Sequence, residues 1–396
     1  MANFLFTWEL GGGLGHVTLI RPFAEALLAR GHQVLCAVQN VSAARKAFGD
    51  ANIPFVPAPF KTGKRQRGIR CPRSYAHLLH NNGFADADEL TALIAAWRNL
   101  FDLFQPDVIL CNHSPTALLA ARGARAQRVL LGDAFCSPPA TVPLPILRPW
   151  AKHDHQRLLK DEQIVCEAAN KALANLKLPR LSRLADLYGD VAESFLLTFA
   201  ELDHFGARKN VRYRGVFNTC AATQPRWPDG TGPKVFAYLK PMPGLEALLT
   251  LLGESSCRTL AHGSWAQDLL RSGKTFRNVR IEPQPVNLEA AAAECDLAVL
   301  NATHGATAAF LLAGKSILQL PIVVEQYLTA RNTQALGAGL LARRNRNEEI
   351  RARLEKVLGE QAFTTAAQRF AQQYSTFDPT DERQAMVERM EQLLQP

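Results

Sequence analysis

Short hydrophobic runs alternate with helical patterns along the first half of the chain. The apolar run Phe4–Trp8 ends at a glycine-rich stretch, and apolar residues then recur at helical spacing between Val17 and Leu28. Five further apolar runs with helical segments between them are Val34–Val38, Ile53–Val56, Val108–Cys111, Val129–Leu131 and Phe195–Thr198. Strands that alternate with helices predict a parallel sheet with helices on both faces.

The second half of the chain repeats this alternation. Its apolar runs are Val235–Tyr238, Thr259–Ala261, Val279–Ile281, Leu297–Leu300, Ile317–Leu320 and Leu340–Ala342. We therefore predict two doubly wound, Rossmann-like α/β domains, at residues 1–219 and 233–375, joined by a polar linker at 220–232 that is rich in proline and glycine. Ligands of such sheets bind outside the carboxyl ends of the strands, so a cleft between the domains is the expected site.

Composition narrows the class of protein. The chain has 396 residues, of which 47% are hydrophobic and 20% charged, as in folded globular proteins. Its eight cysteines form no C-x-x-C pair, which argues against a disulfide scaffold or a cysteine-rich zinc module and suits a reducing compartment. No apolar run reaches the roughly 18–20 residues of a membrane span, and the chain shows no signal peptide at its start. We expect a soluble, cytoplasmic protein.

The net charge of +9 is unevenly distributed. Six cations fall within residues 61–73 without an intervening acid: Lys61, Lys64, Arg65, Arg67, Arg70 and Arg73. Such a loop is either a solvated surface segment or a contact for an anionic partner, such as a phosphate, a lipid head group or an acidic acceptor. Nucleic acid is not expected, because the cluster has no interleaved aromatic residues and no recognisable nucleic-acid module surrounds it.

A glycine-rich loop, containing Gly12, Gly13 and Gly15, follows the first predicted strand and opens the first helix. It lacks the third glycine of a dinucleotide-binding fingerprint, and no acid follows the second strand near Gln39, so a Rossmann dehydrogenase is disfavoured. His16 ends the loop. Its imidazole is suited to take a proton from a hydroxyl at neutral pH, although a helix-capping role is the alternative.

A second group of candidates follows the buried run Leu297–Leu300. Small residues there predict a turn that leads into a helix at Ala308–Ala313. Backbone N–H groups at a helix start, together with the hydroxyls of Thr303 and Thr307, suit a diphosphate.

A third group, Glu325 and Gln326, follows the strand that ends at Pro321. An acid beside an amide can bind several sugar hydroxyls, because Glu accepts hydrogen bonds and Gln both donates and accepts. A glutamate that only favours a helix N-terminus is the alternative.

The order and spacing of these motifs resemble the GT-B glycosyltransferases, in particular the family-1-like, UDP-glycosyltransferase-like bacterial enzymes. The resemblance is strongest in Gly11–Gly31 and Asp296–Gly339. It implies a C-terminal helix, within 376–396, that crosses back to the N-terminal domain. It also implies a hexosyltransferase that uses a UDP- or dTDP-sugar as substrate, inverts the anomeric centre and needs no metal or cofactor.

The resemblance also implies site residues. His16 matches the catalytic base, and Glu325 and Gln326 match the pair that binds the donor sugar. The turn that binds the diphosphate matches Asn301, Thr303, His304, Gly305, Ala306 and Thr307.

The sequence departs from the family pattern at four places. Asn301 stands where the family has the first histidine of the diphosphate turn, and His304 falls on a variable position. The glutamate that binds ribose in many members is replaced by Ala309, and Lys315-Ser316 replaces the usual Val-Pro. The acid that orients the catalytic histidine falls at Asn112, which leaves Asp133, after the next predicted strand, as an alternative partner.

Two other interpretations stay open. The departures at Asn301, Ala309 and Asn112 favour one of them, a non-catalytic GT-B protein that binds a nucleotide sugar or a partner glycosyltransferase. The other is a sugar-nucleotide epimerase, which shares the fold but needs several carboxylates and histidines around the donor carbon. The resemblance places the acceptor on the N-terminal half of the chain. The basic loop 61–73 lies in that half and favours an anionic acceptor. An anionic lipid as acceptor would imply a transient contact with a membrane surface.

Overall fold

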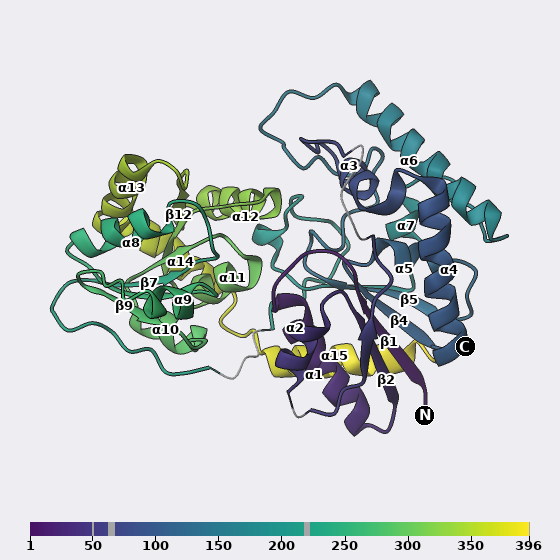
Figure 1. The fold of residues 1–396 in the computed structure, drawn as a ribbon, viewed down its shortest axis with the longest axis horizontal. Coiled ribbons are helices and arrows are strands. Elements are labelled where there is room, and N and C mark those ends of the chain that lie inside the picture. The colour runs from purple at the N-terminus through teal and green to yellow at the C-terminus, as the bar shows by residue number, and fades with distance from the viewer. Residues whose placement is uncertain (50, 62–67, 218–221, 396) are drawn as a thin grey trace. The chain divides into compact units, whose positions relative to one another are not determined.

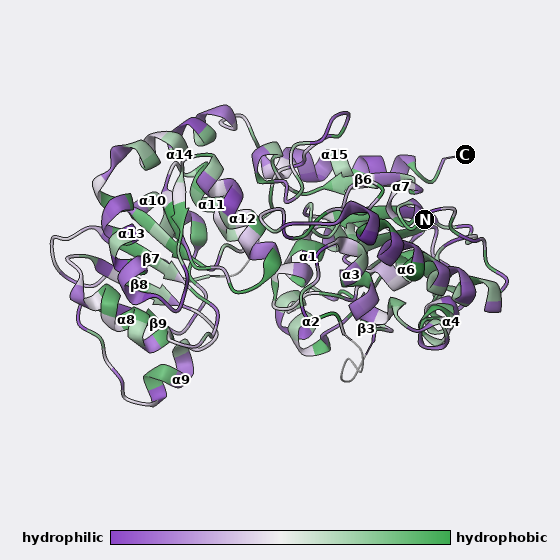
Figure 2. Cartoon of the chain, turned by 90° about the horizontal axis from the view of Figure 1, so that it is seen from above, coloured by the Kyte–Doolittle hydropathy of each residue, from purple (hydrophilic) through white to green (hydrophobic). Residues whose placement is uncertain are grey.

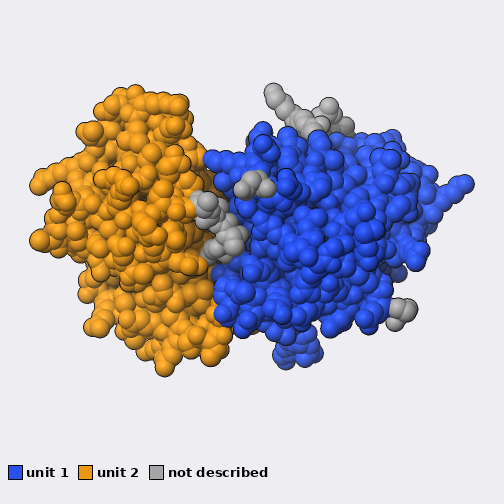
Figure 3. All heavy atoms as spheres, turned by 90° about the horizontal axis from the view of Figure 1, so that it is seen from below, with its two compact units in different colours: residues 1–199, 208–217, 378–396 blue, residues 200–207, 218–377 orange. Residues whose placement is uncertain are grey.

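The computed structural model describes residues 1–49, 51–61, 68–217 and 222–395. These residues form two compact units (Figure 3). The first contains Met1–Phe199, Arg208–Phe217 and Asp378–Pro396, and the second contains Ala200–Ala207 and Asn218–Phe377. Residues 220 and 221 of the expected linker lie outside the described part of the chain.

The first unit is built on a six-stranded parallel sheet with the strand order β3-β2-β1-β4-β5-β6 (Figure 1). The strands are β1 (Asn3–Trp8), β2 (Gln33–Val38), β3 (Phe55–Pro57), β4 (Val108–Asn112), β5 (Gln127–Gly132) and β6 (Glu193–Leu196). The helices are α1 (Gly15–Ala29), α2 (Val41–Phe48), α3 (Tyr75–Leu79), the π-helical turn η1 (His80–Phe84), α4 (Ala87–Phe104), α5 (Pro115–Ala120), α6 (His155–Asn175), α7 (Asp186–Gly189) and α15 (Pro379–Gln392).

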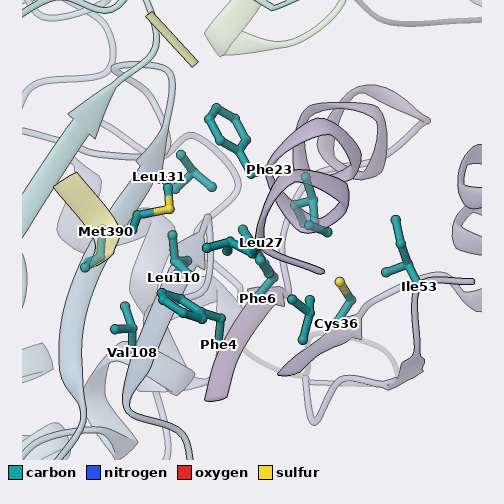
Figure 4. Close-up of a cluster of buried hydrophobic side chains, with 14 of the residues drawn as sticks. Phe4, Phe6, Phe23, Leu27, Cys36, Ile53, Val108, Leu110, Leu131 and Met390 are labelled. Atoms are coloured by element: carbon teal, nitrogen blue, oxygen red, sulfur yellow. The ribbon is translucent and has the colours of Figure 1, made fainter. Parts of the chain in front are cut away.

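The core of the first unit explains why the last helix of the chain belongs to it. Phe4 and Phe6 of β1 and Phe23 of α1 are fully buried, and Met390 of α15 enters the same cluster (Figure 4). Met386 of α15 also belongs to this cluster. The remaining faces of α15 carry mostly hydrophilic residues (Figure 2). The amphipathic pattern near the C-terminus thus reflects burial against the first unit, and the expected return of the C-terminal helix is confirmed.

The second unit has the same topology, because its strand order, read from the matching edge of the sheet, is β9-β8-β7-β10-β11-β12. Its strands are β7 (Lys234–Tyr238), β8 (Arg258–His262), β9 (Val279–Glu282), β10 (Leu297–Leu300), β11 (Ser316–Gln319) and β12 (Gly339–Leu341). Its helices are the 3₁₀ turn η2 (Ala200–Leu202), α8 (Leu245–Glu254), α9 (Ala266–Arg271), α10 (Leu288–Glu294), α11 (His304–Leu312), α12 (Val324–Ala335), α13 (Asn347–Gly359) and α14 (Gln361–Gln373).

The strand pattern read from the sequence is confirmed, since each apolar run overlaps a strand of one of the two parallel sheets. One boundary is wrong. The helix expected to begin at Ala308 begins at His304, so the residues assigned to a turn form the first turn of α11. His304, Ala306 and Thr307 in this first turn are buried, and tertiary packing overrides the weak helix propensity of Gly305 and Thr307. Every described helix is too short or too polar to traverse a lipid bilayer.

Candidate functional site

The glycine-rich loop of the first unit joins β1 to α1. Gly11 and Gly13 have positive φ angles of +90° and +92°, which side-chain-bearing residues rarely adopt. A Cβ atom placed on Gly11 would lie only 2.4 Å from Nε2 of His16. Glycine is therefore required at position 11 for two reasons: the backbone turns there, and the imidazole of His16 occupies the adjoining space.

His16, the second residue of α1, is fixed by its neighbours on β1 and β4. Its ring stacks on Trp8, with ring centroids 5.1 Å apart and an interplanar angle of 20°. Its Nδ1 lies 2.6 Å from Oδ1 of Asn112. Trp8 and Asn112 are register partners in the sheet, so β1 and β4 present both contacts side by side.

The hydrogen bonds of Asn112 determine the tautomer of His16. Asn112 is buried, and its Nδ2 donates to the carbonyl oxygen of Leu131 at 2.7 Å, which leaves Oδ1 facing the histidine. A carbonyl oxygen only accepts hydrogen bonds, so Nδ1 of His16 must carry the proton. In the neutral ring Nε2 is then the basic nitrogen.

Asp133, the other expected partner of His16, follows β5. It is half-buried, and its Oδ1 accepts a hydrogen bond from the backbone nitrogen of Cys136 at 2.9 Å. The structure therefore brings Asn112 to Nδ1 of His16 and gives Asp133 a role in the turn after β5.

His113 was missed by the sequence analysis, although it directly follows Asn112. It is buried, its backbone has a φ of +50°, and its ring centroid lies 6.2 Å from that of His16. Burial, reinforced by the neighbouring His16, lowers the pKa of His113 to about 3. His113 therefore stays neutral at physiological pH and adds no positive charge beside His16.

Glu9 was also missed, and it lies between β1 and the glycine-rich loop. Its buried carboxyl group accepts hydrogen bonds from Oγ1 of Thr116 and from the backbone nitrogens of Thr116 and Ala117, at the start of α5. Burial raises the pKa of Glu9 to about 8 despite these hydrogen bonds. In the sequence, a single acid beside a glycine-rich loop does not indicate that its carboxyl group will be buried against the start of α5.

In the second unit, Asn301 follows β10 and is buried. Its Oδ1 accepts a hydrogen bond from the backbone nitrogen of Lys240 at 2.5 Å. Its Nδ2 donates to the carbonyl oxygen of Leu320 at 2.7 Å and lies 3.6 Å from the sulfur of Met242. The side chain of Asn301 thus joins neighbouring strand ends, and its donors are already used within the unit.

The other residues of the expected diphosphate turn form the start of α11. Thr303 is the N-cap and makes no side-chain cap bond, while its carbonyl oxygen accepts from the nitrogen of Thr307 at 2.9 Å. The hydroxyl of Thr307 is buried and accepts a hydrogen bond from Nε2 of Gln319 at 3.0 Å. The N–H groups of His304, Gly305 and Ala306 head the helix, where the dipole favours an anion.

Glu325 and Gln326 lie in the first turn of α12. The amide oxygen of the buried Gln326 accepts from the backbone nitrogens of Ile322 and Val323, at 2.8 and 3.4 Å, and so caps the helix. Only its amide nitrogen remains suited to a ligand. Glu325 is half-buried, and its backbone oxygen accepts from Oγ1 of Thr329 at 3.3 Å.

His204 lies beside these two helix starts and was not singled out by the sequence. It belongs to the short segment Ala200–Ala207 of the second unit. Its Nε2 lies 3.0 Å from Oγ1 of Thr329, and its ring centroid lies 5.6 Å from that of His304. No motif surrounds it, so only the fold reveals this position.

Comparison with known proteins agrees with this architecture. No protein-family model matches the chain. Among curated proteins, it is similar to a PGL/p-HBAD biosynthesis glycosyltransferase of Mycobacterium tuberculosis (strain ATCC 25177 / H37Ra). The two are 25% identical over 316 residues, which are 74% of this chain and 72% of that protein.

Solved structures are similar over nearly the whole chain. Glycosyltransferase VinC in complex with dTDP has a TM-score of 0.67 at 16% identity and covers 98% of this chain and 100% of its own. Glycosyltransferase SsfS6 of Streptomyces sp. SF2575, complexed with thymidine diphosphate, has a TM-score of 0.63 at 20% identity, covering 99% and 100%. Spinosyn rhamnosyltransferase SpnG, complexed with spinosyn aglycone, has a TM-score of 0.65 at 16% identity, covering 99% and 100%.

These similarities establish the fold. The chain has the GT-B fold, and the resemblance to GT-B glycosyltransferases expected from its motifs is confirmed at that level.

Proposed function

We propose that the protein is a glycosyltransferase that moves a sugar from a dTDP- or UDP-sugar to an acceptor hydroxyl, with His16 as the general base. The observation that carries this proposal is the hydrogen-bond chain from Leu131 through Asn112 to His16. This chain leaves Nε2 of His16 as the basic nitrogen, beside the glycine-rich loop at the carboxyl ends of the strands. A histidine that only capped α1 would not need its tautomer fixed in this way.

In the proposed reaction, Nε2 of His16 takes the proton of the acceptor hydroxyl as its oxygen attacks the anomeric carbon. The bond from that carbon to the β-phosphate oxygen breaks, and its electron pair leaves with the nucleoside diphosphate. A single displacement of this kind inverts the anomeric centre. The amide of Asn112 holds the imidazole in place, but it cannot stabilise the imidazolium as strongly as a carboxylate does.

The second unit would bind the donor. The N–H groups at the start of α11 are suited to the diphosphate, and the hydroxyl of Thr303 adds a donor. The carboxylate of Glu325 and the amide nitrogen of Gln326 are suited to the sugar hydroxyls. Charge neutralisation by a helix start and hydroxyl groups requires no metal ion. The dTDP complexes of VinC and SsfS6 favour thymidine as the nucleoside.

The acceptor would bind the first unit. Within the basic loop 61–73, Lys64, Arg65 and Arg67 lie outside the described residues, whereas Lys61 pairs with Glu89. The described end of the loop lines a cavity of about 380 Å³ together with α6, and its walls include Ile69, Arg73, Arg157, Leu158, Ile164 and Val165. The apolar walls favour an apolar acceptor. Asp154 and Asp161 also line the cavity, and Asp161 pairs with Arg157, so the preference for an anionic acceptor and for a transient contact with a membrane surface rests on the cations of the basic loop 61–73.

One observation supports the second candidate, a non-catalytic GT-B protein. Asn301 stands where the family has a histidine. Its Nδ2 donates to the carbonyl oxygen of Leu320 and to the sulfur of Met242, so this side chain has no donor left for the diphosphate. Such a protein would bind the nucleotide sugar without turning it over.

Donor turnover separates the candidates. The protein is incubated with dTDP-glucose or UDP-glucose, and released nucleoside diphosphate and free sugar are measured by chromatography. We expect slow hydrolysis that depends on His16, and transfer once an acceptor is supplied. Binding without release would favour the non-catalytic candidate. Recovery of a different sugar still attached to the nucleotide would identify an epimerase.

A further inference from the structure

The segment Ala200–Ala207 is firmly attached to the second unit. Nδ2 of Asn332, on α12, donates to the carbonyl oxygen of Asp203 at 2.8 Å. Nε2 of Gln373 and the hydroxyl of Tyr374, at the end of α14, each donate to the carboxylate of Glu201 at 2.6 Å. These contacts, which involve the residues just before His204, hold the segment against α12 and α14 and so position the His204 side chain.

His204 is only 4% exposed, and the orientation of its ring follows from its hydrogen bond with Thr329. The hydroxyl of Thr329 donates to the carbonyl oxygen of Glu325, one turn earlier on α12. Because that proton is used there, Oγ1 of Thr329 accepts from His204, so Nε2 of His204 is the protonated nitrogen at 3.0 Å. The same hydroxyl thus links the histidine to the backbone of Glu325.

The ring is also close to residues of both groups expected to recognise the donor. A ring nitrogen of His204 lies within 4.8 Å of a carboxylate oxygen of Glu325. The ring centroid of His304, at the head of α11, is 5.6 Å away on a tilted plane. One buried side chain is therefore close both to a residue proposed to bind the sugar and to a residue at the helix start proposed to bind the diphosphate.

We propose that His204 is a positioning residue of the donor site. It holds the carboxylate of Glu325 and the ring of His304 in one arrangement, and so couples recognition of the sugar to recognition of the diphosphate. The inference rests on the proposed function, because it assigns Glu325 and His304 to the donor. Burial means that His204 acts through these neighbours. Removal of the ring should therefore lower the affinity most for dTDP-glucose, less for dTDP and not at all for thymidine, which lacks both the diphosphate and the sugar of the donor.

The test is equilibrium binding of dTDP-glucose, dTDP and thymidine to the full chain by isothermal titration calorimetry, with the uridine series run alongside. For His204→Ala we expect the Kd of dTDP-glucose to rise roughly 10- to 100-fold and that of dTDP by roughly threefold, with thymidine unchanged; a tenfold change is about 1.4 kcal/mol. His204→Gln retains an N–H group toward Thr329, and should recover most of the affinity for dTDP-glucose.

A matched control lies on the same helix. Thr333 is buried, and its hydroxyl donates to the carbonyl oxygen of Thr329 at 3.1 Å, so Thr333→Ala removes a buried hydroxyl of α12 one turn beyond the residue that bonds His204. It should leave all three affinities within about twofold of the wild type.

Equal weakening of the three ligands by His204→Ala, or an equal loss in Thr333→Ala, would assign His204 to stability alone and overturn the inference. If His204→Ala does not fold, His204→Gln decides: a residual loss of affinity that is larger for dTDP-glucose than for dTDP and absent for thymidine supports positioning, whereas unchanged affinities or a uniform loss contradict it. A wild-type protein that binds none of the nucleotides would refute the proposed function itself, which is a distinct result.

Discussion

The two units carry an asparagine at the same topological position, yet they use it differently. Asn112 ends β4 and Asn301 follows β10, and these are the equivalent strands of two sheets with the same order. Each Nδ2 donates to a carbonyl oxygen at the end of the next strand, Leu131 or Leu320, at 2.7 Å. The Oδ1 of Asn112 faces His16, whereas that of Asn301 accepts from the backbone of Lys240.

The difference arises in the loop after the first strand of each sheet. In the first unit, glycines at positive φ allow the imidazole of His16 to lie against the loop and meet the asparagine. In the second unit, the backbone nitrogen of Lys240 occupies that place. The same side chain is therefore part of a proposed catalytic group in one unit and a purely structural link in the other. Position in the fold sets the structural role, and the adjacent loop decides whether a chemical role is added.

Removal of the imidazole should have the largest effect. His16→Ala should lower the turnover of donor and acceptor at least about 100-fold, because a positioned general base contributes about that much or more. The affinity for dTDP, measured by calorimetry, should not change. Near-normal turnover would move the role of base to another residue.

Gly11→Ala should cause a loss of turnover that approaches that of His16→Ala, although His16 itself is not substituted. The added Cβ atom would lie 2.4 Å from Nε2 of His16, so the ring has to leave its place, and turnover should fall about 10- to 100-fold. Gly13→Ala is the matched control, because its φ is also positive but nothing lies within 4 Å of the added atom. If the two variants lose activity equally, backbone strain and not ring displacement is responsible.

Paired alanine variants test the comparison of the two asparagines. Asn112→Ala and Asn301→Ala each remove the same strand-bridging hydrogen bond, and each should lower the free energy of unfolding by about 1–3 kcal/mol in urea titrations. Only Asn112→Ala should also reduce turnover, by about tenfold, because His16 loses control of its tautomer. A comparable loss of turnover in Asn301→Ala would show that the second asparagine also serves the chemistry.

Glu325→Ala should weaken binding of dTDP-glucose by about tenfold and leave dTDP nearly unaffected, since a charged hydrogen bond to a sugar hydroxyl is lost. Gln326→Ala should show the same preference and also lower stability by about 1 kcal/mol, because the capping oxygen of α12 disappears. Calorimetry and thermal unfolding separate the two effects. Equal weakening of dTDP and dTDP-glucose would argue against a sugar contact.

Glu9 should have the smallest effect on turnover and should act instead through a pH dependence of stability. Its carboxyl has a pKa of about 8 in the folded state, compared with an ordinary value of 4.5, so the folded protein retains a proton that the unfolded chain releases between these values. The contribution of Glu9 to stability should therefore decrease as the pH rises from about 4.5 to about 8. Glu9→Gln should flatten that slope in thermal unfolding curves, and an unchanged slope would mean that other groups produce it.

The strands were predictable from the sequence because both sheets are buried on their two faces, so each strand appears as a continuous apolar run. His16 was predictable as a candidate from the glycine-rich loop, whereas Asn112 was a candidate only because the family resemblance places there the acid that orients the base. The role of Asn301 was not, because its partners Lys240 and Leu320 are distant in sequence and are bonded through backbone atoms. His204 and Glu9 escaped for a similar reason: neither lies in a motif, and each acquires its neighbours only when the chain folds.

The central claim is that the second unit binds a nucleoside diphosphate while the first unit supplies His16 as the general base. Its most direct test is equilibrium binding of dTDP, UDP, GDP and ADP, with NAD as the control, to the wild type and to Gly11→Ala. We predict selective binding of dTDP or UDP, with the same affinity in both proteins, and reduced turnover only in the variant. Failure to bind any nucleoside diphosphate, or a parallel loss of affinity and turnover in Gly11→Ala, would contradict the account.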